Sequence, residues 1–524
     1  MGKYIGIDLG TTFSCMAYIN EDGNPVVISN AEGENITASA VYYSEDGRTV
    51  VGDAAKEASL ENPQNFVEHI KCFMGRGKFG ENAVHTSDGR SFEPEDVSAV
   101  ILKKLKTDAE KLLGDTIDGA VITVPAYFND LQRDATQKAG EIAGLNVMGI
   151  INEPTAAALA FGASAESADR QTILVYDLGG GTFDVTVMEI DGNEITVLAT
   201  DGDREKGGRN FDMLIIEDAY KQALSQGIDL KKDDDDWRDL TMKAEKCKRN
   251  LSQASQSSFI IKAAGGKKFS YTLTRDDFEK MLEQHIIQTI SVVEGVCEDA
   301  EISYSDLDKI LLVGGSTRIP MIARVLEDET GIKPSGEVHP DEAVAIGAAF
   351  YACELAHKFA ESKPNNSGTN QPDIPELKKS FSFTDVTSHS IGLVAQDSDT
   401  GKLYNSIVLP RNEPVPAQFT NRYHTTQPFQ SEIELQITQG EDEDIEYVPI
   451  IGTSVIQIAP RENPVTVEVT ISCDENSIIH VNVTDVDANT FLGEMEIDRT
   501  CNLTREQIED SKHLIETLDI SGDF

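Results

Sequence analysis

The sequence predicts two α/β lobes that face each other across a cleft, followed by an all-β domain. An apolar, strand-like run ends in an aspartate and a glycine-containing turn at two places, Asp8 and Asp177. Beyond residue 375 the texture changes to short alternating segments separated by turn residues, and this pattern is typical of a β-sandwich.

The two halves of the first part of the chain have the same order of elements. Each half has three strand-like runs and then a strand that leads through a loop into a helix. The runs are 4–8, 13–19, 26–30 and 119–125 in the first half, and 173–176, 183–190, 194–200 and 309–316 in the second. We interpret this repetition as an internal duplication that produces two lobes, each with a mixed sheet and helices.

Helical patterns and changes in composition set the predicted boundaries. Helices are expected near 130–144, 153–161, 237–252 and 341–356. A polar, proline-containing stretch at 361–375 reads as loop or linker. The predicted domains are 1–360, with lobes at about 1–170 and 171–360, a linker at 361–386, a sandwich at 387–503 and a short helical end at 504–524.

Composition excludes several classes of partner. The net charge of −45 argues against nucleic acid and anionic membranes, which need basic surfaces. No apolar stretch is long enough to span a bilayer. Seven scattered cysteines predict reduced thiols in the cytoplasm. The acidic runs Asp233–Asp236 and Glu441–Asp444 are interpreted as solvated loops.

Glycine-rich loops carry the candidate chemistry. A P-loop, zinc spacing and a nucleophile elbow are absent from the sequence. Backbone N–H groups of facing glycine turns can hold a triphosphate, and Asp8 and Asp177 can hold magnesium through water. The loop residues are Gly10, Thr11, Thr12 and Phe13; Gly179, Gly180, Gly181 and Thr182; Gly207 and Gly208; and Gly314, Gly315, Ser316, Thr317 and Arg318.

Each of these features has a plainer reading when it is taken alone. A glycine turn between strands can be a hairpin, and Lys71 can be a surface lysine. A polar helix face of Glu245, Lys248, Arg249 and Ser252 can be solvated and held by intrahelical ion pairs. Four glycine loops in this order are far more specific than any one of them.

Residues 2 to about 355 resemble the ATPase domain of the 70-kDa heat-shock chaperone family, the DnaK type. The matching stretches are 6–12, Val124–Asp130, Asn152–Ala158, Asp177–Asp184, Gly314–Pro320 and His339–Ala343. The resemblance implies a two-lobed actin-like or hexokinase-like fold, with ATP or ADP and Mg²⁺ in the cleft and K⁺ as a further candidate cation.

The resemblance also implies a role for each matched residue. Lys71 would position the attacking water, beside a hydrolytic centre of Glu153, Asp177 and Thr182. Asp8 and Asp177 would serve the metal. Glu245, Lys248, Arg249 and Ser252 would clamp the adenosine, and Ser316, Arg318 and Asp341 would complete the nucleotide pocket. Pro125 and Arg133 would relay the nucleotide state between domains.

The second domain resembles the peptide-binding sandwich of that family more loosely, through Asp385–Thr387 and Ile437–Glu441. An extended unfolded segment would lie in a channel with one apolar pocket. Candidates for the pocket are Leu393, Phe419, Ile433 and Leu435, although each can equally be ordinary sandwich core. The implied partners are unfolded polypeptides, a J-domain co-chaperone and a nucleotide exchange factor.

Two departures from the family pattern bear on coupling. The linker reads Ser380-Phe381-Ser382-Phe383-Thr384-Asp385 where the family is leucine-rich. Only 504–524 remains for the helical lid that follows the sandwich in the family. The predicted function is an ATP-hydrolysing chaperone for exposed hydrophobic segments. The alternatives on the same fold are a small-molecule kinase and a nucleotide-switched scaffold.

Overall fold

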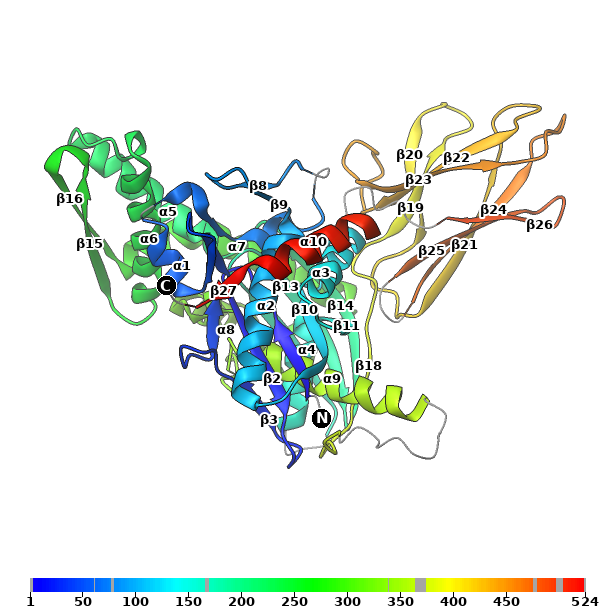
Figure 1. Cartoon of the computed structure of the whole chain (residues 1–524). Helices are drawn as coiled ribbons and strands as arrows, with labels where there is room; N and C mark the ends of the chain where they lie inside the picture. Colours follow the sequence, from blue (N-terminus) through cyan, green and yellow to red (C-terminus); the bar gives the residue numbers. More distant parts are fainter. Residues whose placement is uncertain are drawn as a thin grey trace.

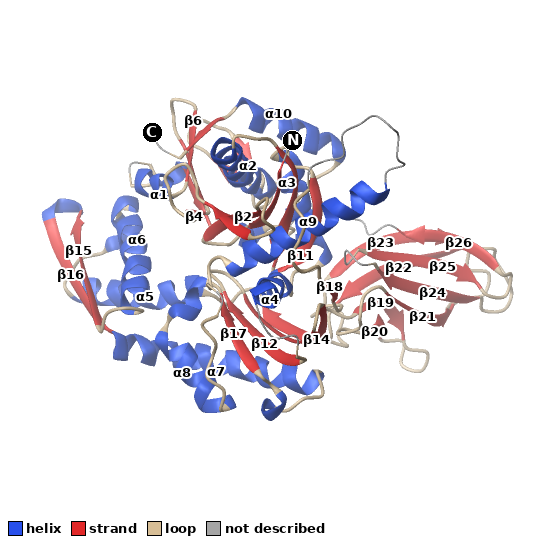
Figure 2. Cartoon of the chain, turned by 90° about the horizontal axis from the view of Figure 1, so that it is seen from below, coloured by secondary structure: helices blue, strands red, loops and turns tan. Residues whose placement is uncertain are grey.

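The protein has two α/β lobes with a β-sandwich beside them (Figure 1). The structure is a computed structural model that describes residues 3–60, 62–76, 80–164, 169–337, 339–362, 374–474, 478–495 and 503–522. The predicted fold class is confirmed, and Figure 2 shows the two lobes on either side of the central helices.

The first lobe is built on a mixed sheet in the order β11-β10-β1-β2-β3, with β4 beside β2. β1 runs parallel to β10, with Ile7 opposite Ile122, and antiparallel to β2. The strands are β1 (Lys3–Asp8), β2 (Phe13–Ile19), β3 (Pro25–Ile28), β4 (Ile36–Ala38), β10 (Ile117–Val124) and β11 (Val147–Asn152).

The second lobe repeats this pattern in the order β17-β12-β13-β14-β18. β12 runs parallel to β17 and antiparallel to β13, as β1 does to β10 and β2. The strands are β12 (Gln171–Leu178), β13 (Phe183–Asp191), β14 (Glu194–Asp203), β17 (Lys309–Val313) and β18 (Ser382–Thr384). The internal duplication is therefore confirmed, and both aspartates stand at the end of equivalent strands.

Two central helices make contacts with strands from the other half of the sequence. Helix α9 (Ala343–Ser362) belongs to the second half but packs against β1 and β2, and α4 (Glu153–Ser164) belongs to the first half but contacts β12 and β13. A side chain at Gly347 would place its Cβ 1.7 Å from the Ala156 carbonyl oxygen. These two helices therefore lie between the two sheets and contact each other closely.

The remaining elements cover the two sheets. In the first lobe they are α1 (Asp53–Ala58), β5 (Ala40–Tyr43), β6 (Arg48–Val51), β7 (Phe66–Glu68), β8 (Val84–His85), β9 (Ser91–Phe92), α2 (Pro94–Leu113) and α3 (Asp130–Ile142). In the second they are α5 (Gly208–Ser225), α6 (Asp234–Leu251), β15 (Gln256–Ala263), β16 (Lys267–Thr274), α7 (Arg275–Asp299) and α8 (Pro320–Thr330).

One predicted loop is wrong. The acidic run Asp233–Asp236 forms the cap and first turn of α6 rather than a solvated loop. The Asp233 carboxylate accepts hydrogen bonds from the N–H groups of Asp235 and Asp236. Acidic residues are favoured there because they accept hydrogen bonds from the free N–H groups of the first turn. Their negative charge also interacts favourably with the positive end of the helix dipole.

The sandwich consists of two antiparallel sheets, β20-β19-β22-β23 and β21-β24-β25-β26. Its strands are β19 (Ile391–Gln396), β20 (Leu403–Leu409), β21 (Ala417–His424), β22 (Glu432–Gln439), β23 (Ile450–Gln457), β24 (Thr466–Cys473), β25 (Ile479–Asp485) and β26 (Thr490–Met495). The sequence analysis assigned no strand to β21, whose core-facing side chains Ala417, Phe419 and Tyr423 are interrupted by the polar Asn421.

The divergent linker is docked on the second lobe. Residues 363–373 of the predicted linker lie outside the described residues, but β18 pairs in parallel with β14. Phe381 is 5% exposed and lies against Gly162, and Phe383 meets the Tyr351 ring edge-on at 5.0 Å. Both phenylalanine side chains therefore pack against an apolar cluster, at a linker where the family is leucine-rich.

The C-terminal segment forms the predicted helix, α10 (Arg505–Thr517), and then a strand, β27 (Asp519–Ser521). The helix lies on α2 and α3 of the first lobe (Figure 1), and β27 pairs with β6. Among the described residues, no helix is both long and apolar enough to cross a bilayer.

Candidate functional site

The glycine loops of both lobes meet around one cavity of about 660 Å³. Each loop follows a strand whose end faces the opposite lobe. Of the predicted residues, the cavity is lined by Asp8, Gly10, Thr11, Thr12, Phe13, Lys71, Glu153, Asp177, Gly179, Gly180, Thr182, Glu245, Lys248, Arg249, Ser252, Gly314, Gly315, Ser316, Arg318 and Asp341.

The loops approach one another so closely that glycine is required where they touch. A Cβ at Gly180 would lie 1.8 Å from the Thr12 hydroxyl oxygen, across the gap between the lobes. Gly314 adopts a φ of +81°, and a Cβ there would lie 2.5 Å from the Leu178 carbonyl oxygen. Side chains at either position would push the loops apart and widen the cavity.

Four of the predicted loop residues lie behind the lining rather than in it: Gly181, Gly207, Gly208 and Thr317. The Gly208 N–H donates to the Gly179 carbonyl, and the Thr317 hydroxyl donates to the Gly314 carbonyl. These residues hold the neighbouring loops in position. They are not among the residues that line the cavity.

Several carboxylates are buried together at the bottom of the cavity. Asp177 and Asp184 are 5% and 1% exposed, and Asp8 is half-buried beside them. Burial and the nearby Glu153 carboxylate raise the pKa of Asp8 to about 7, and the same two causes raise the pKa of Asp184 to about 7. The pKa of Asp177 is raised well above its usual value, again by burial and then by Glu153.

Lys71 faces this cluster from the first lobe. Its ammonium nitrogen lies 2.5 Å from a Glu153 carboxylate oxygen, and the Lys71 side chain is 5% exposed. Lys71 belongs to the short turn that follows β7, and His69 at the start of this turn has a φ of +61°. The plain reading of Lys71 as a surface lysine is therefore wrong.

The cluster fits a divalent cation held through water. One ammonium faces several buried carboxylates, so the site carries excess negative charge that a cation would neutralise. Within the described residues, no three carboxylate, histidine or cysteine side chains are arranged to ligate a metal directly. Magnesium suits this arrangement, because it keeps several of its water ligands and takes others from phosphate.

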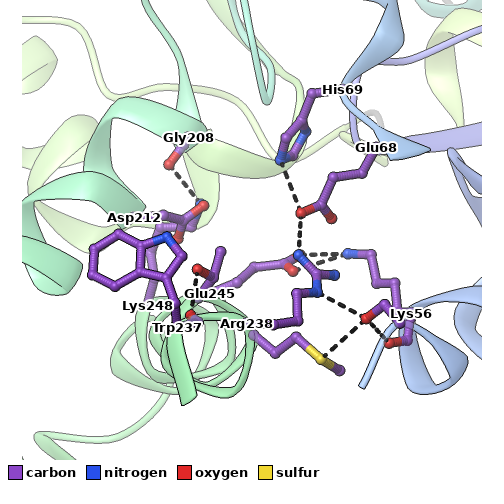
Figure 3. A network of polar contacts seen from close by, with 12 residues as sticks. Lys56, Glu68, His69, Gly208, Asp212, Trp237, Arg238, Glu245 and Lys248 are labelled. Atoms are coloured by element: carbon purple, nitrogen blue, oxygen red, sulfur yellow. Dashed lines mark hydrogen bonds and ion pairs between the residues drawn. The ribbon is translucent and has the colours of Figure 1, made fainter. Parts of the chain in front are cut away.

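Opposite these carboxylates, α6 contributes a polar face that connects the two lobes (Figure 3). Glu245 of α6 accepts both contacts from Lys56 of α1, at 2.9 and 3.0 Å. Lys248 donates to the Gly208 carbonyl and to Asp212, whose pKa is raised to about 6 by burial. This helix face therefore makes tertiary contacts, and the reading with intrahelical ion pairs is wrong.

Aromatic and basic side chains close the same end of the cavity. The Arg249 guanidinium lies 5.1 Å from the centre of the Phe13 ring, and the Lys56 ammonium lies at the same distance from it. A second link across the lobes joins Arg238 to Glu68 at 2.6 Å and to Ser59 at 2.8 Å (Figure 3). A guanidinium beside a ring is suited to stacking on a purine base.

The fourth loop adds a polar group near the other wall. The Ser316 hydroxyl donates to the Gly179 carbonyl at 2.7 Å, which fastens this loop to the second one. The Arg318 guanidinium is paired with the Asp341 carboxylate. Both side chains of this pair line the cavity, so they can meet the far end of a bound nucleotide.

The two predicted relay residues lie where the linker reaches the first lobe. Arg133 donates to the carbonyls of Phe128 and Ala126 and to the Asn152 side chain. Asn152 in turn donates to the carboxylate of Asp385 at the end of the linker. Pro125 is buried in the same turn, and its carbonyl accepts from Phe128. Arg133 is therefore not a simple exposed arginine.

The four predicted peptide-pocket residues lie in one apolar cluster of the sandwich. Leu393 and Leu435 are each 4% exposed, whereas Phe419 and Ile433 are half-buried at the margin of the cluster. The structure brings the four side chains together but does not separate a peptide pocket from the sandwich core.

Sequence reasoning missed part of the lining and most of the contacts between the lobes. The cavity also touches Ser14, Cys15, Ile36, Gln253, Val313, Ile319, Pro340 and Val344. Lys56 and Arg238 carried no sequence signal, because a single cation on a polar helix does not indicate a partner almost two hundred residues away. Asp184 did carry one, since it closes the glycine stretch that begins at Asp177.

Comparison with known protein families gives one match over nearly the whole chain. The family model described as "Hsp70 protein" matches residues 4–519 of the 524. The match spans both lobes, the linker, the sandwich and α10.

Proposed function

This chain belongs to the Hsp70 family of ATP-dependent chaperones, and on that premise we propose that it hydrolyses ATP between its lobes to control how its sandwich holds unfolded segments. Members of the family bind nucleotide with Mg²⁺ and act on unfolded proteins. The observation that carries the proposal is the shared cavity, where loops of both lobes surround a buried carboxylate cluster and Lys71.

The proposed hydrolytic centre consists of Lys71, Glu153, Asp177 and Thr182. The Lys71 ammonium can orient a water molecule and offset charge that develops on the transferred phosphoryl group. Glu153 holds this ammonium in place through its ion pair. Asp8 and Asp177 would hold Mg²⁺ through water, and the bound ion would supply charge neutralisation for the phosphates. K⁺ is a further candidate beside the same carboxylates.

We propose that nucleotide binding holds the lobes together through the rest of the cavity. Phosphate oxygens would accept from the loop N–H groups of both lobes, and the base would lie near Arg249 and Ser252. Loss of nucleotide would leave the cross-lobe ion pair of Lys56 with Glu245 as a remaining contact. The lobes would then open faster, and a nucleotide exchange factor would act on this opening step.

For the sandwich, we propose that Leu393, Phe419, Ile433 and Leu435 form the apolar pocket for an extended segment. Main-chain hydrogen bonds would supply affinity, and the pocket would select one apolar side chain. The chain of contacts from Asp385 through Asn152 to Arg133 supports a path between this domain and the cleft. A J-domain co-chaperone would act on the same coupling.

Steady-state ATP hydrolysis with and without a short apolar peptide tests the proposal. We expect hydrolysis that requires Mg²⁺ and that rises when the peptide is added. A charged peptide of the same length serves as the control and should leave the rate unchanged. Hydrolysis without stimulation would reject the coupling, and transfer of phosphate to a sugar or polyol would favour a kinase instead.

A further inference from the structure

The C-terminal segment lies on the nucleotide-binding part of the chain and not on the sandwich that precedes it. In Figure 1, α10 is drawn in red beside α2 and α3, and β27 follows it. The same contacts are present in the structure between α10 and α3, α10 and α2, and β27 and β6. The segment therefore connects the far end of the sandwich to the first lobe.

Helix α10 is seated through its apolar side. Ile508 and Ile515 are 7% and 1% exposed and join the core of the first lobe together with Leu503. Thr504 begins the helix with a capping box, in which its hydroxyl accepts from the Gln507 N–H. Lys103 of α2 donates to the Ile515 carbonyl in the last turn, which also accepts from the N–H of Leu518 at the end of the helix.

Strand β27 extends a small sheet whose order is β27-β6-β5-β7. It pairs in parallel with β6, with Ile520 opposite Thr49, and Ile520 packs against the core of the first lobe. Without β27, β6 would be an edge strand with unpaired backbone groups, and such an edge accepts an added peptide strand.

The same sheet and the same helices lead to Lys71. At the opposite edge of the sheet, β7 runs directly into His69 and the turn that contains Lys71. Helix α2 packs against this turn, and the Ser98 hydroxyl of α2 contacts the Met74 sulfur at 3.3 Å. The C-terminal segment therefore contacts α2 directly, and it belongs to the sheet whose opposite edge strand, β7, leads into the Lys71 turn.

We propose that the β6 edge is a docking site for an extended peptide segment, that its occupant is the chain's own strand Asp519–Ser521, and that this docking positions Lys71. Asp519–Ser521 and α10 together act as a C-terminal strap. Three observations identify this occupant: the register of the pairing, the burial of the apolar side of α10, and the contact of the partly buried Ile520 side chain with the core of the first lobe. The strap residues act through Lys71 and are positioning residues.

Because of the strap, the sandwich is attached to the two lobes at two places. Its N-terminal end is fastened to the second lobe by β18 on β14, and its C-terminal end is fastened to the first lobe by β27 on β6. A movement of one lobe relative to the other therefore acts on both attachments. Through the sheet, a pull on the C-terminal attachment reaches β7, the strand that precedes the Lys71 turn.

The test compares Ile520→Pro with Ile520→Val in the full chain. Proline removes an N–H group and disfavours strand pairing, whereas valine keeps both the apolar contact and the strand. Hydrogen exchange of residues 48–51 and 505–521 should rise on the order of tenfold in the proline variant and stay at the wild-type level in the valine variant. Unchanged exchange at 48–51 would overturn the docking site.

A kinetic measurement on the same variants tests the positioning of Lys71, and this arm rests on the proposed ATPase. The proline variant should lose several-fold in kcat for ATP hydrolysis with KM for ATP unchanged, and the valine variant should match the wild type. Faster exchange without a change in kcat would overturn the positioning role. A chain without any ATPase activity would reject the proposed function and leave the exchange result standing.

Dependence on protein concentration separates this occupant from a strand supplied by a second copy. Protection of 48–51 that is the same in dilute and concentrated protein, with a monomeric mass, supports pairing within one chain. Protection that appears only on concentration, together with a dimer, would show that the edge is filled by another copy and would overturn the strap.

Discussion

The nucleotide cleft and the sandwich pocket are both proposed binding sites, but they are built from opposite materials. The cleft buries Asp177 and Asp184 beside the half-buried Asp8 and an ion-paired Lys71, and its walls are backbone loops. The sandwich pocket consists of apolar side chains that belong to the same cluster as the domain core. A buried charge destabilises the fold unless it is paired, whereas buried apolar surface stabilises the fold whether or not it also binds a ligand. A cluster of buried charges therefore indicates a functional site, whereas an apolar pocket cannot be told apart from the core of the domain.

The sharpest test of the cleft is Lys71→Ala. If the ammonium stabilises the reacting phosphoryl group, kcat for ATP hydrolysis should fall about 10²–10³-fold. Binding of nucleotide should persist, because most of the cavity lining is untouched. Single-turnover hydrolysis and a nucleotide-binding titration measure the two effects.

Lys56→Ala is the matched control for Lys71→Ala, since Lys56 also pairs with a glutamate at the same cavity. Its loss should speed nucleotide release by a few-fold and leave the chemical step close to the wild type. Equal losses of kcat in the two variants would contradict a specific role for Lys71 and would reduce the cleft to general electrostatics.

Asp8→Asn tests whether the cleft carries unpaired charge. The pKa of Asp8 is raised from 3.8 to about 7 in the fold. The folded state therefore binds this proton more tightly than the unfolded state, and stability is lost as the pH rises through that window. Relative to the wild type, the nucleotide-free variant should gain nothing near pH 4 and at most about 4 kcal/mol above pH 7.

Denaturation of both chains across pH, without nucleotide or magnesium, measures this difference. Asp118→Asn provides the control, since Asp118 is an exposed carboxylate on the same sheet. The gain of Asp8→Asn should shrink when Mg²⁺ and nucleotide are added. Parallel pH profiles for Asp8→Asn and the wild type would argue against a charged cation site.

Phe381→Ala tests the connection between the two regions. Truncation of this buried ring should weaken docking of the linker by about 3 kcal/mol. Stimulation of ATP hydrolysis by peptide should then disappear while basal hydrolysis persists. Phe383→Ala removes a less buried ring and should have a smaller effect, and the reverse order would show that Tyr351 holds the linker instead.

The smallest expected effect belongs to the sandwich pocket. Ile433→Ala should weaken binding of a short apolar peptide about tenfold, as loss of one pocket side chain typically does. Fluorescence anisotropy of a labelled peptide measures the change. Ile407→Ala removes an exposed side chain of the same domain and should leave affinity unchanged. Equal losses in both variants would place the peptide elsewhere on the sandwich.

The sequence was most informative where residue types are chemically committed. Glycine at 180 and 314 and aspartate at 8 and 177 have few uses other than close backbone approach and charge, so the loops of the cleft could be predicted. The duplication of the strands followed from the repeated order of apolar runs and turns, and the acidic run before Trp237 was misread because it caps a helix.

The remaining features depend on partners that are distant in the sequence. The close packing of α4 on α9 depends on Gly347 and Ala156, which are almost two hundred residues apart. The pairs of Lys56 with Glu245 and of Arg238 with Glu68 form only once the lobes face each other. A pattern within one segment carries no information about such contacts.

By itself, the sequence determined the two kinds of domain and the loops that surround the cavity, since periodicity and glycine turns are local properties of the chain. Only the tertiary structure decided where the ends of the sandwich are attached. The Phe381 ring packs where it does because Gly162 has no side chain in its way. Strand β27 pairs with β6 because that edge of the sheet is otherwise unpaired. Both contact sites are formed by other parts of the fold, so the sequence of a segment as short as Asp519–Ser521 does not indicate where it binds.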